Sequence, residues 1–180
     1  MFDIDNYYEA KSLPDAIELL AANPKAIVIA GGTDVLIKVR EGKLAGCSLV
    51  GIRNIEELSG IRIDDTGAIQ IGPLTTFAQL LEHPVIKERI PVLAEAAEQV
   101  GGPQLRNLGT VGGNLANGSP SADMAPPLLA LDCDLKIRGP GGERILSLTD
   151  FYLAAGKVAL MPGELLAEII VNPSGYRDFG

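Results

Sequence analysis

The first forty residues change their hydrophobic period several times, and each change predicts an element. Residues 12–24 place apolar side chains on one face of a helix, for which Ser12 is a suitable N-cap. The apolar run at 25–31 predicts a buried strand that ends at Gly31. Residues 35–40 predict a short helix directly after that turn.

A second apolar run at 47–52 predicts another buried strand, and residues 54–60 predict a helical turn that Gly60 closes. A strand, a helix and a strand within about forty residues are typical of a small parallel unit. We therefore predict a first lobe over residues 1–58.

The pattern changes after residue 58. Residues 60–74 and 133–148 alternate apolar and polar positions around Gly-containing turns, which predicts two hairpins. Helices are predicted at 76–84 and 91–100, and Ser119-Pro120 resembles the N-cap and first residue of a further helix. We predict an α+β fold whose second lobe, residues 59–180, has an antiparallel sheet with helices to one side.

Composition narrows the classes of function. The 180 residues are 47% hydrophobic and carry a net charge of −8, with scattered basic residues. That balance argues against nucleic acid as a partner, because phosphate contacts need clustered Lys and Arg. No apolar run is long enough for a membrane helix, and no secretory signal precedes the first helix, so we expect a cytoplasmic protein without a membrane partner.

The residues that usually carry metals or nucleophiles are few. Cys47 and Cys133 are the two cysteines, and they cannot ligate an iron–sulfur cluster. The single histidine, His83, precedes Pro84 where a helix is expected to end, and no nucleophile elbow accompanies it. We expect no metal site and name no catalytic acid or base.

The first glycine turn, Gly31-Gly32-Thr33-Asp34, follows a buried strand and precedes a helix. Glycine lets backbone N–H groups approach a ligand, and a helix N-terminus favours an anion. Asp34 would repel phosphate, so we interpret it as a helix cap or as an acceptor from a sugar hydroxyl. Glycine can also serve the geometry of such a turn alone, and both interpretations stay open here.

The second glycine-rich stretch is longer. Six glycines between 101 and 118 alternate with amide and hydroxyl side chains, which costs chain entropy and buries little apolar surface. Neither stretch is a P-loop or a dinucleotide-binding fingerprint. Two donor-rich turns on different lobes would suit a diphosphate held between them, whereas the alternative is a long surface loop.

The segments AGGTDVLI (30–37), QLRNLGTVGGNLANGSPSADMAPPLLAL (104–131) and GKVALMPGELLAEIIV (156–171) resemble the FAD-binding subunit of molybdenum hydroxylases, and xanthine dehydrogenase subunits of bacteria most of all. The resemblance implies a two-lobed FAD-binding fold of the para-cresol methylhydroxylase type. It implies non-covalent FAD, since His83 lies in neither glycine turn. The cofactor-binding positions it implies are Val28, Ile29, Ala30, Gly31, Gly32, Thr33, Asp34, Val35, Val100, Thr110, Val111, Gly112, Gly113, Asn114, Asp123 and Leu166.

The resemblance also implies partners. A molybdenum-cofactor subunit would oxidise the substrate, and a subunit with 2Fe–2S clusters would pass electrons to this FAD and on to NAD⁺ or another acceptor. Two departures stand out: a family lysine near the flavin would fall around Asp178, and the family's C-terminal domain is absent from these 180 residues. The alternative is therefore a truncated, non-catalytic module that binds a nucleotide or assists assembly.

Overall fold

The computed structural model of the chain describes residues 3–177, and its N-terminal part forms a small parallel sheet. The strand order is β1-β3-β2. The elements of this part are β1 (Ile4–Glu9), α1 (Leu13–Ala22), β2 (Ile27–Ile29), α2 (Val35–Arg40), β3 (Cys47–Gly51) and the 3₁₀ turn η1 (Glu56–Leu58).

Local sequence explains most of this lobe. The Ser12 hydroxyl accepts a hydrogen bond from the Asp15 N–H at 3.3 Å, which caps α1 as predicted. Leu13 and Leu20 then turn inward and join one apolar cluster with Val50 of β3. The exception is β1, which has no clear period of its own and forms by pairing in parallel with β3.

The larger part is built on an antiparallel sheet of five strands in the order β4-β5-β10-β6-β7. The two predicted hairpins are confirmed as β4–β5 and β6–β7, and β10 lies between them. The strands are β4 (Ile61–Ile63), β5 (Ile69–Ile71), β6 (Asp134–Gly139), β7 (Gly142–Ser147) and β10 (Leu165–Val171), with a separate short hairpin of β8 (Tyr152–Ala154) and β9 (Lys157–Val158).

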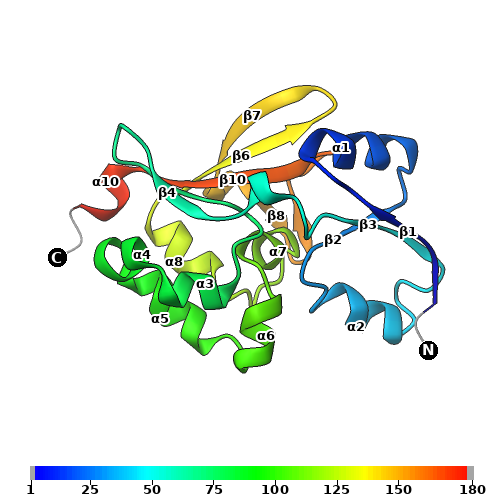
Figure 1. Cartoon of the computed structure of the whole chain (residues 1–180), viewed down its shortest axis with the longest axis horizontal. Helices are drawn as coiled ribbons and strands as arrows, with labels where there is room; N and C mark the ends of the chain where they lie inside the picture. The colour runs from blue at the N-terminus through cyan, green and yellow to red at the C-terminus, as the bar shows by residue number, and fades with distance from the viewer. Residues whose placement is uncertain (1–2, 178–180) are drawn as a thin grey trace.

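Short helices cover one side of this sheet, as Figure 1 shows for the green and yellow-green elements. Their side chains and those of the strands form one core, in which Phe77, Leu80 and Leu93 pack with Ile69 and Ile137. The helices are α3 (Phe77–Glu82), α4 (Pro84–Arg89), α5 (Pro91–Gln99), α6 (Pro103–Leu108), α7 (Val111–Ala116), α8 (Ala125–Ala130), α9 (Leu148–Phe151) and α10 (Pro173–Tyr176). The α+β prediction is confirmed.

Several boundaries differ from the predictions. Strand β2 ends at Ile29, two residues before Gly31. The helix expected to open at Ser119-Pro120 instead begins at Ala125, because a helix from 120 to 130 would hold Pro126 and Pro127 in its interior, where proline has no N–H to donate. Ser119 instead accepts from the Ser121 N–H in a local turn, at 3.3 Å.

The two cores meet where β10 begins. Leu165 belongs to the apolar cluster of the N-terminal lobe, whereas its neighbour Leu166 belongs to the large core under the sheet. Successive residues of a strand face opposite sides, so one short segment joins both cores. None of the helices in the described residues is long and apolar enough to cross a bilayer.

Candidate functional site

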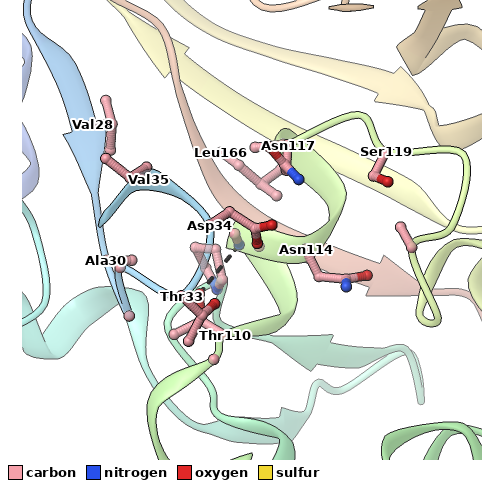
Figure 2. A pocket seen from close by; sticks show the side chains of 18 of the residues that line it. Val28, Ala30, Thr33, Asp34, Val35, Thr110, Asn114, Asn117, Ser119 and Leu166 are labelled. Carbon is pink, nitrogen blue, oxygen red and sulfur yellow. Dashed lines mark hydrogen bonds between the residues drawn. The ribbon is translucent and has the colours of Figure 1, made fainter. Parts of the chain in front are cut away.

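A cleft of about 720 Å³ lies between the two lobes. Its size is within the range of about 300–1,000 Å³ that is typical of small-molecule sites. One wall comes from β2 and the start of α2, and the facing wall comes from α7 and the segment after it; the start of β10 completes the lining. Figure 2 shows side chains from both walls around this space.

The first glycine turn supplies unused backbone donors. Among the hydrogen bonds of residues 3–177, none has the N–H of Gly31, Gly32, Thr33 or Asp34 as its donor. Gly32 has a φ of +73°, a left-handed conformation that glycine adopts without strain. Successive N–H groups around such a residue form a concave site for an anion.

Asp34 stands at the N-cap position of α2, but its side chain makes no capping hydrogen bond. The prediction that it caps this helix is therefore wrong, and its exposed carboxylate remains available as an acceptor. Acceptance from a sugar hydroxyl stays a prediction.

The second glycine turn forms the unforeseen helix α7, and its backbone donors are already used. The N–H of Val111 donates to the Thr75 carbonyl at 3.0 Å, and that of Gly112 donates to the Pro73 carbonyl at 2.8 Å. The N–H of Gly113 donates to the Thr110 hydroxyl, which caps the helix, at 3.2 Å. The expectation that both turns offer free backbone donors is thus wrong for the second turn.

The glycines of both turns permit close packing of backbone. A Cβ atom built on Gly31 would overlap the carbonyl of Leu108, and one on Gly112 would overlap Pro73. On Gly113, by contrast, a Cβ would meet only the Thr110 hydroxyl oxygen, at 2.8 Å. Gly31 and Gly112 therefore hold the walls together, whereas the missing side chain of Gly113 leaves open space beside the cleft.

Charged groups in the cleft are few. Asp34, Asp123 and Glu164 are acidic, and Lys38 is the one cation among the described residues that line it. Glu164 accepts two hydrogen bonds from Arg144, at 2.9 and 2.7 Å, and one from the Met161 N–H at 2.8 Å. The hydrogen bonds from Arg144 hold the pKa of Glu164 below its usual value, so this carboxylate is charged and already satisfied near neutral pH.

The structure brings most of the predicted site residues together. Val100 and Leu166, which were placed by resemblance alone, both line the cleft, and so does Asp123. Ile29 and Val111 do not: Val111 is buried in the large core, beside the cleft wall. Asp178 lies outside the described residues. The predicted residues in the lining are Val28, Ala30, Gly31, Gly32, Thr33, Asp34, Val35, Val100, Thr110, Gly112, Gly113, Asn114, Asp123 and Leu166.

Sequence reasoning missed a polar contact across the cleft. The Lys38 ammonium donates to the Asn117 side-chain oxygen at 2.6 Å, and both residues line the cleft. The available signal was the position of Lys38 one helical turn after Asp34, on the same side of α2. The Asn114 side chain also has an unforeseen role, because its oxygen accepts from the Met124 N–H at 3.2 Å and fixes the segment that carries Asp123.

Residues 1–173 match the family described as the FAD binding domain in molybdopterin dehydrogenase. This chain belongs to that family. The putative xanthine dehydrogenase FAD-binding subunit of Escherichia coli (strain K12) is 45% identical over 180 residues, which is 100% of this chain and 62% of the relative. The carbon monoxide dehydrogenase medium chain of Afipia carboxidovorans is 37% identical over 175 residues, which covers 95% of this chain and 60% of the relative.

Solved structures agree with the FAD-binding family. The cyanide-inactivated Cu,Mo-CO dehydrogenase superposes with a TM-score of 0.91 at 33% identity and covers 96% of this chain and 60% of that one. Glucooligosaccharide oxidase from Acremonium strictum has a TM-score of 0.54 at 15% identity, which indicates a likeness of fold alone. The chain thus spans about 60% of the length of the family members to which it is similar.

Proposed function

We propose that this chain binds FAD non-covalently in the cleft and acts as the flavin-carrying, electron-transferring subunit of a xanthine dehydrogenase-like molybdenum hydroxylase. The observation that carries the proposal is the row of four unused N–H groups at residues 31–34, on the wall of a cleft between two lobes. Four neighbouring backbone donors without a partner among the described residues are suited to a diphosphate.

The residues present fit a dinucleotide. The apolar part of the lining, which includes Val28, Val100 and Leu166, suits flat aromatic rings. Gly113 leaves the room that a side chain would fill. The cleft therefore combines an anion-binding turn with apolar walls, and that pair of features favours a dinucleotide over a free phosphate.

We assign roles within the cleft on that basis. Gly31, Gly32, Thr33 and Asp34 would hold the diphosphate through their N–H groups and the Thr33 hydroxyl. The carboxylates of Asp34 and Asp123 would accept from ribose hydroxyls. The two residues outside the lining, Ile29 and Val111, would support neighbouring residues that line the cleft. The remaining predicted residues would exclude water and fix the rings: Val28, Ala30, Val35, Val100, Thr110, Gly112, Gly113, Asn114 and Leu166.

Bound FAD supplies redox chemistry that accepts electrons in one-electron or two-electron steps, and the chain supplies position and electrostatics. None of the thiols or imidazoles of the described residues lines the cleft, which supports a non-covalent cofactor. We name no catalytic acid or base and no metal ligand, and no group of His, Cys, Asp or Glu suited to a metal occurs within residues 3–177.

The relatives named above support the rest of the proposal. A molybdenum-cofactor subunit and a 2Fe–2S subunit would be the partners, and electrons would leave for NAD⁺ or another acceptor. We place the complex in the cytoplasm, with neither nucleic acid nor a membrane as a partner. We also propose residues 1–58 and 59–180 as the two FAD-binding lobes, which the two apolar clusters support, although Leu74 and Leu165 join the first cluster from beyond residue 58.

A visible spectrum tests this proposal against the alternative of a non-catalytic module. We expect the purified chain to be yellow, or to become so with added FAD, and to lose its flavin absorbance with dithionite. Acid precipitation should release the flavin into the supernatant, as a non-covalent cofactor requires. A colourless chain that takes up no FAD would support the non-catalytic module and overturn the redox function.

A further inference from the structure

Lys38 occupies an unusual position in the cleft. It lies on α2 of the N-terminal lobe and reaches Asn117, the C-cap residue of α7 in the other lobe, at 2.6 Å. The two residues are separated by 79 positions in the sequence. The Lys38 side chain is half-buried, so its ammonium group is held at the cleft rather than in open solvent.

The charge of this ammonium group is not neutralised. An ammonium has three N–H donors, and Asn117 takes one of them with a neutral oxygen. Among residues 3–177, no carboxylate lies within 4.0 Å of the Lys38 nitrogen, although Asp34 stands four positions earlier on the same helix. A partly desolvated cation without an anionic partner costs free energy, and an anionic ligand would recover it.

The other charges of the cleft make this cation distinctive. The chain carries a net charge of −8, and Asp34 and Asp123 add negative charge to the lining itself. Backbone N–H groups can bind a diphosphate locally, but they bring no net charge against this field. Among the described residues of the lining, Lys38 alone offers a full positive charge.

We propose that Lys38 recognises the anionic diphosphate of the dinucleotide and that Asn117 holds the ammonium group in the cleft until the cofactor binds. This inference rests on the proposed function, because it assumes that a dinucleotide occupies the cleft. Lys38 exchanges a neutral acceptor for an anionic one, so its ammonium group gains an attraction between opposite charges that the neutral Asn117 oxygen does not supply. FAD affinity then depends on salt through this residue.

Variants separate this role from the alternative that the Lys38–Asn117 hydrogen bond only holds the two lobes together. Lys38→Met removes the charge, Lys38→Arg keeps it, and Asn117→Ala removes the partner but leaves the ammonium in place. Lys25→Met is the matched control, since Lys25 is an exposed cation of the same lobe outside the cleft lining. The flavin-free 180-residue chain is titrated with FAD at low and high KCl, and flavin fluorescence reports the dissociation constant.

At low salt we expect Lys38→Met to weaken FAD binding about tenfold, which is about 1.4 kcal/mol. The salt dependence of FAD binding should be smaller in that variant, because salt screens attraction between charges and methionine carries no charge. Lys38→Arg and Asn117→Ala should stay within about threefold of the wild type, and Lys25→Met should match it. Unfolding temperatures of the free variants show that each one folds.

Two results would overturn the proposal. One is an unchanged FAD affinity and salt dependence in Lys38→Met. The other is an equal loss of affinity in Lys38→Met and Asn117→Ala, since both remove the hydrogen bond between the lobes and only Lys38→Met removes the charge. If Lys38→Met does not fold, the salt dependence of the Asn117→Ala and Lys38→Arg variants decides the matter, and its loss in either one contradicts a charge contact. A wild-type chain that binds no FAD refutes the proposed function instead.

Discussion

The two glycine turns look alike in sequence and differ in what they leave free. The turn at 31–34 keeps four N–H groups without a partner among the described residues, whereas residues 111–114 use their N–H groups on Thr75, Pro73 and Thr110. The first turn can therefore bind a ligand through backbone, and residues 111–114 cannot do so without breaking existing bonds. The second turn instead shapes the cleft wall, through the close packing of Gly112 on Pro73 and the space beside Gly113.

The difference has a structural cause. The turn at 31–34 joins a strand to a helix in a small lobe, and no carbonyl of the described residues accepts from its N–H groups. The second turn starts a helix that packs against residues 73–75, and carbonyl groups of those residues accept from the first N–H groups of the helix. The backbone donors thus remain for a ligand in the first turn, whereas packing against residues 73–75 uses those of the second.

The largest effect is expected from Gly31→Ala, which tests the contact between the first turn and the end of α6. The new methyl group would overlap the Leu108 carbonyl, so the first turn must move away from α6. We expect a loss of about 3 kcal/mol in the free energy of unfolding and loss of FAD retention. Thermal unfolding and the flavin spectrum measure both.

Gly141→Ala is the control for that substitution, because a Cβ there meets nothing within 4 Å and the residue does not have a positive φ. It should match the wild type in both measurements. A stable, yellow Gly31→Ala variant would show that the first turn does not lie against Leu108 as described.

The next effect is expected from Gly113→Val, which tests the space beside the second turn. The Cβ atom would meet only the Thr110 hydroxyl, so the cost in stability should be about 1 kcal/mol, the value of a lost helix cap. FAD retention, in contrast, should be abolished, because the side chain fills space that the cofactor needs. The flavin-to-protein absorbance ratio measures this, and Gly102→Val, outside the cleft lining, is the matched control. A wild-type ratio in Gly113→Val would contradict the site.

Much of the fold could be predicted because its signals are local. The N-cap at Ser12 and the alternation around Gly67 and Gly141 suffice for α1 and for both hairpins. Strand β1 was missed because its stability comes from pairing with residues forty positions away. Proline was the misleading signal. Pro84 was interpreted only as the end of a helix, but it is also the first residue of the next helix, α4.

The candidate site was harder to predict, because sequence identifies residues but not the partners of their donors. The glycine turns could be found from composition and resemblance, and most of the predicted residues do line one cleft. That the donors of α7 are used depends on the carbonyls of Pro73 and Thr75, which no motif connects with residues 111–112. The contact between Lys38 and Asn117 likewise exists only once the lobes face each other.

The smallest effects are expected from substitutions of two threonines: Thr33, which follows the glycines of the first turn, and Thr110, which precedes those of the second. The Thr33 hydroxyl has no hydrogen bond among the described residues, whereas the Thr110 hydroxyl caps α7. Thr33→Val should weaken FAD binding about tenfold or more, because a hydrogen bond to a charged group contributes about 1.5–3 kcal/mol, and it should leave the unfolding temperature unchanged. Thr110→Val should do the reverse: it should cost about 1 kcal/mol of stability, and it should change the affinity little because valine keeps the shape of threonine beside the cofactor. Fluorescence titration and thermal unfolding of both variants measure the contrast, and equal effects of the two substitutions would remove the distinction between a turn that binds and a turn that supports.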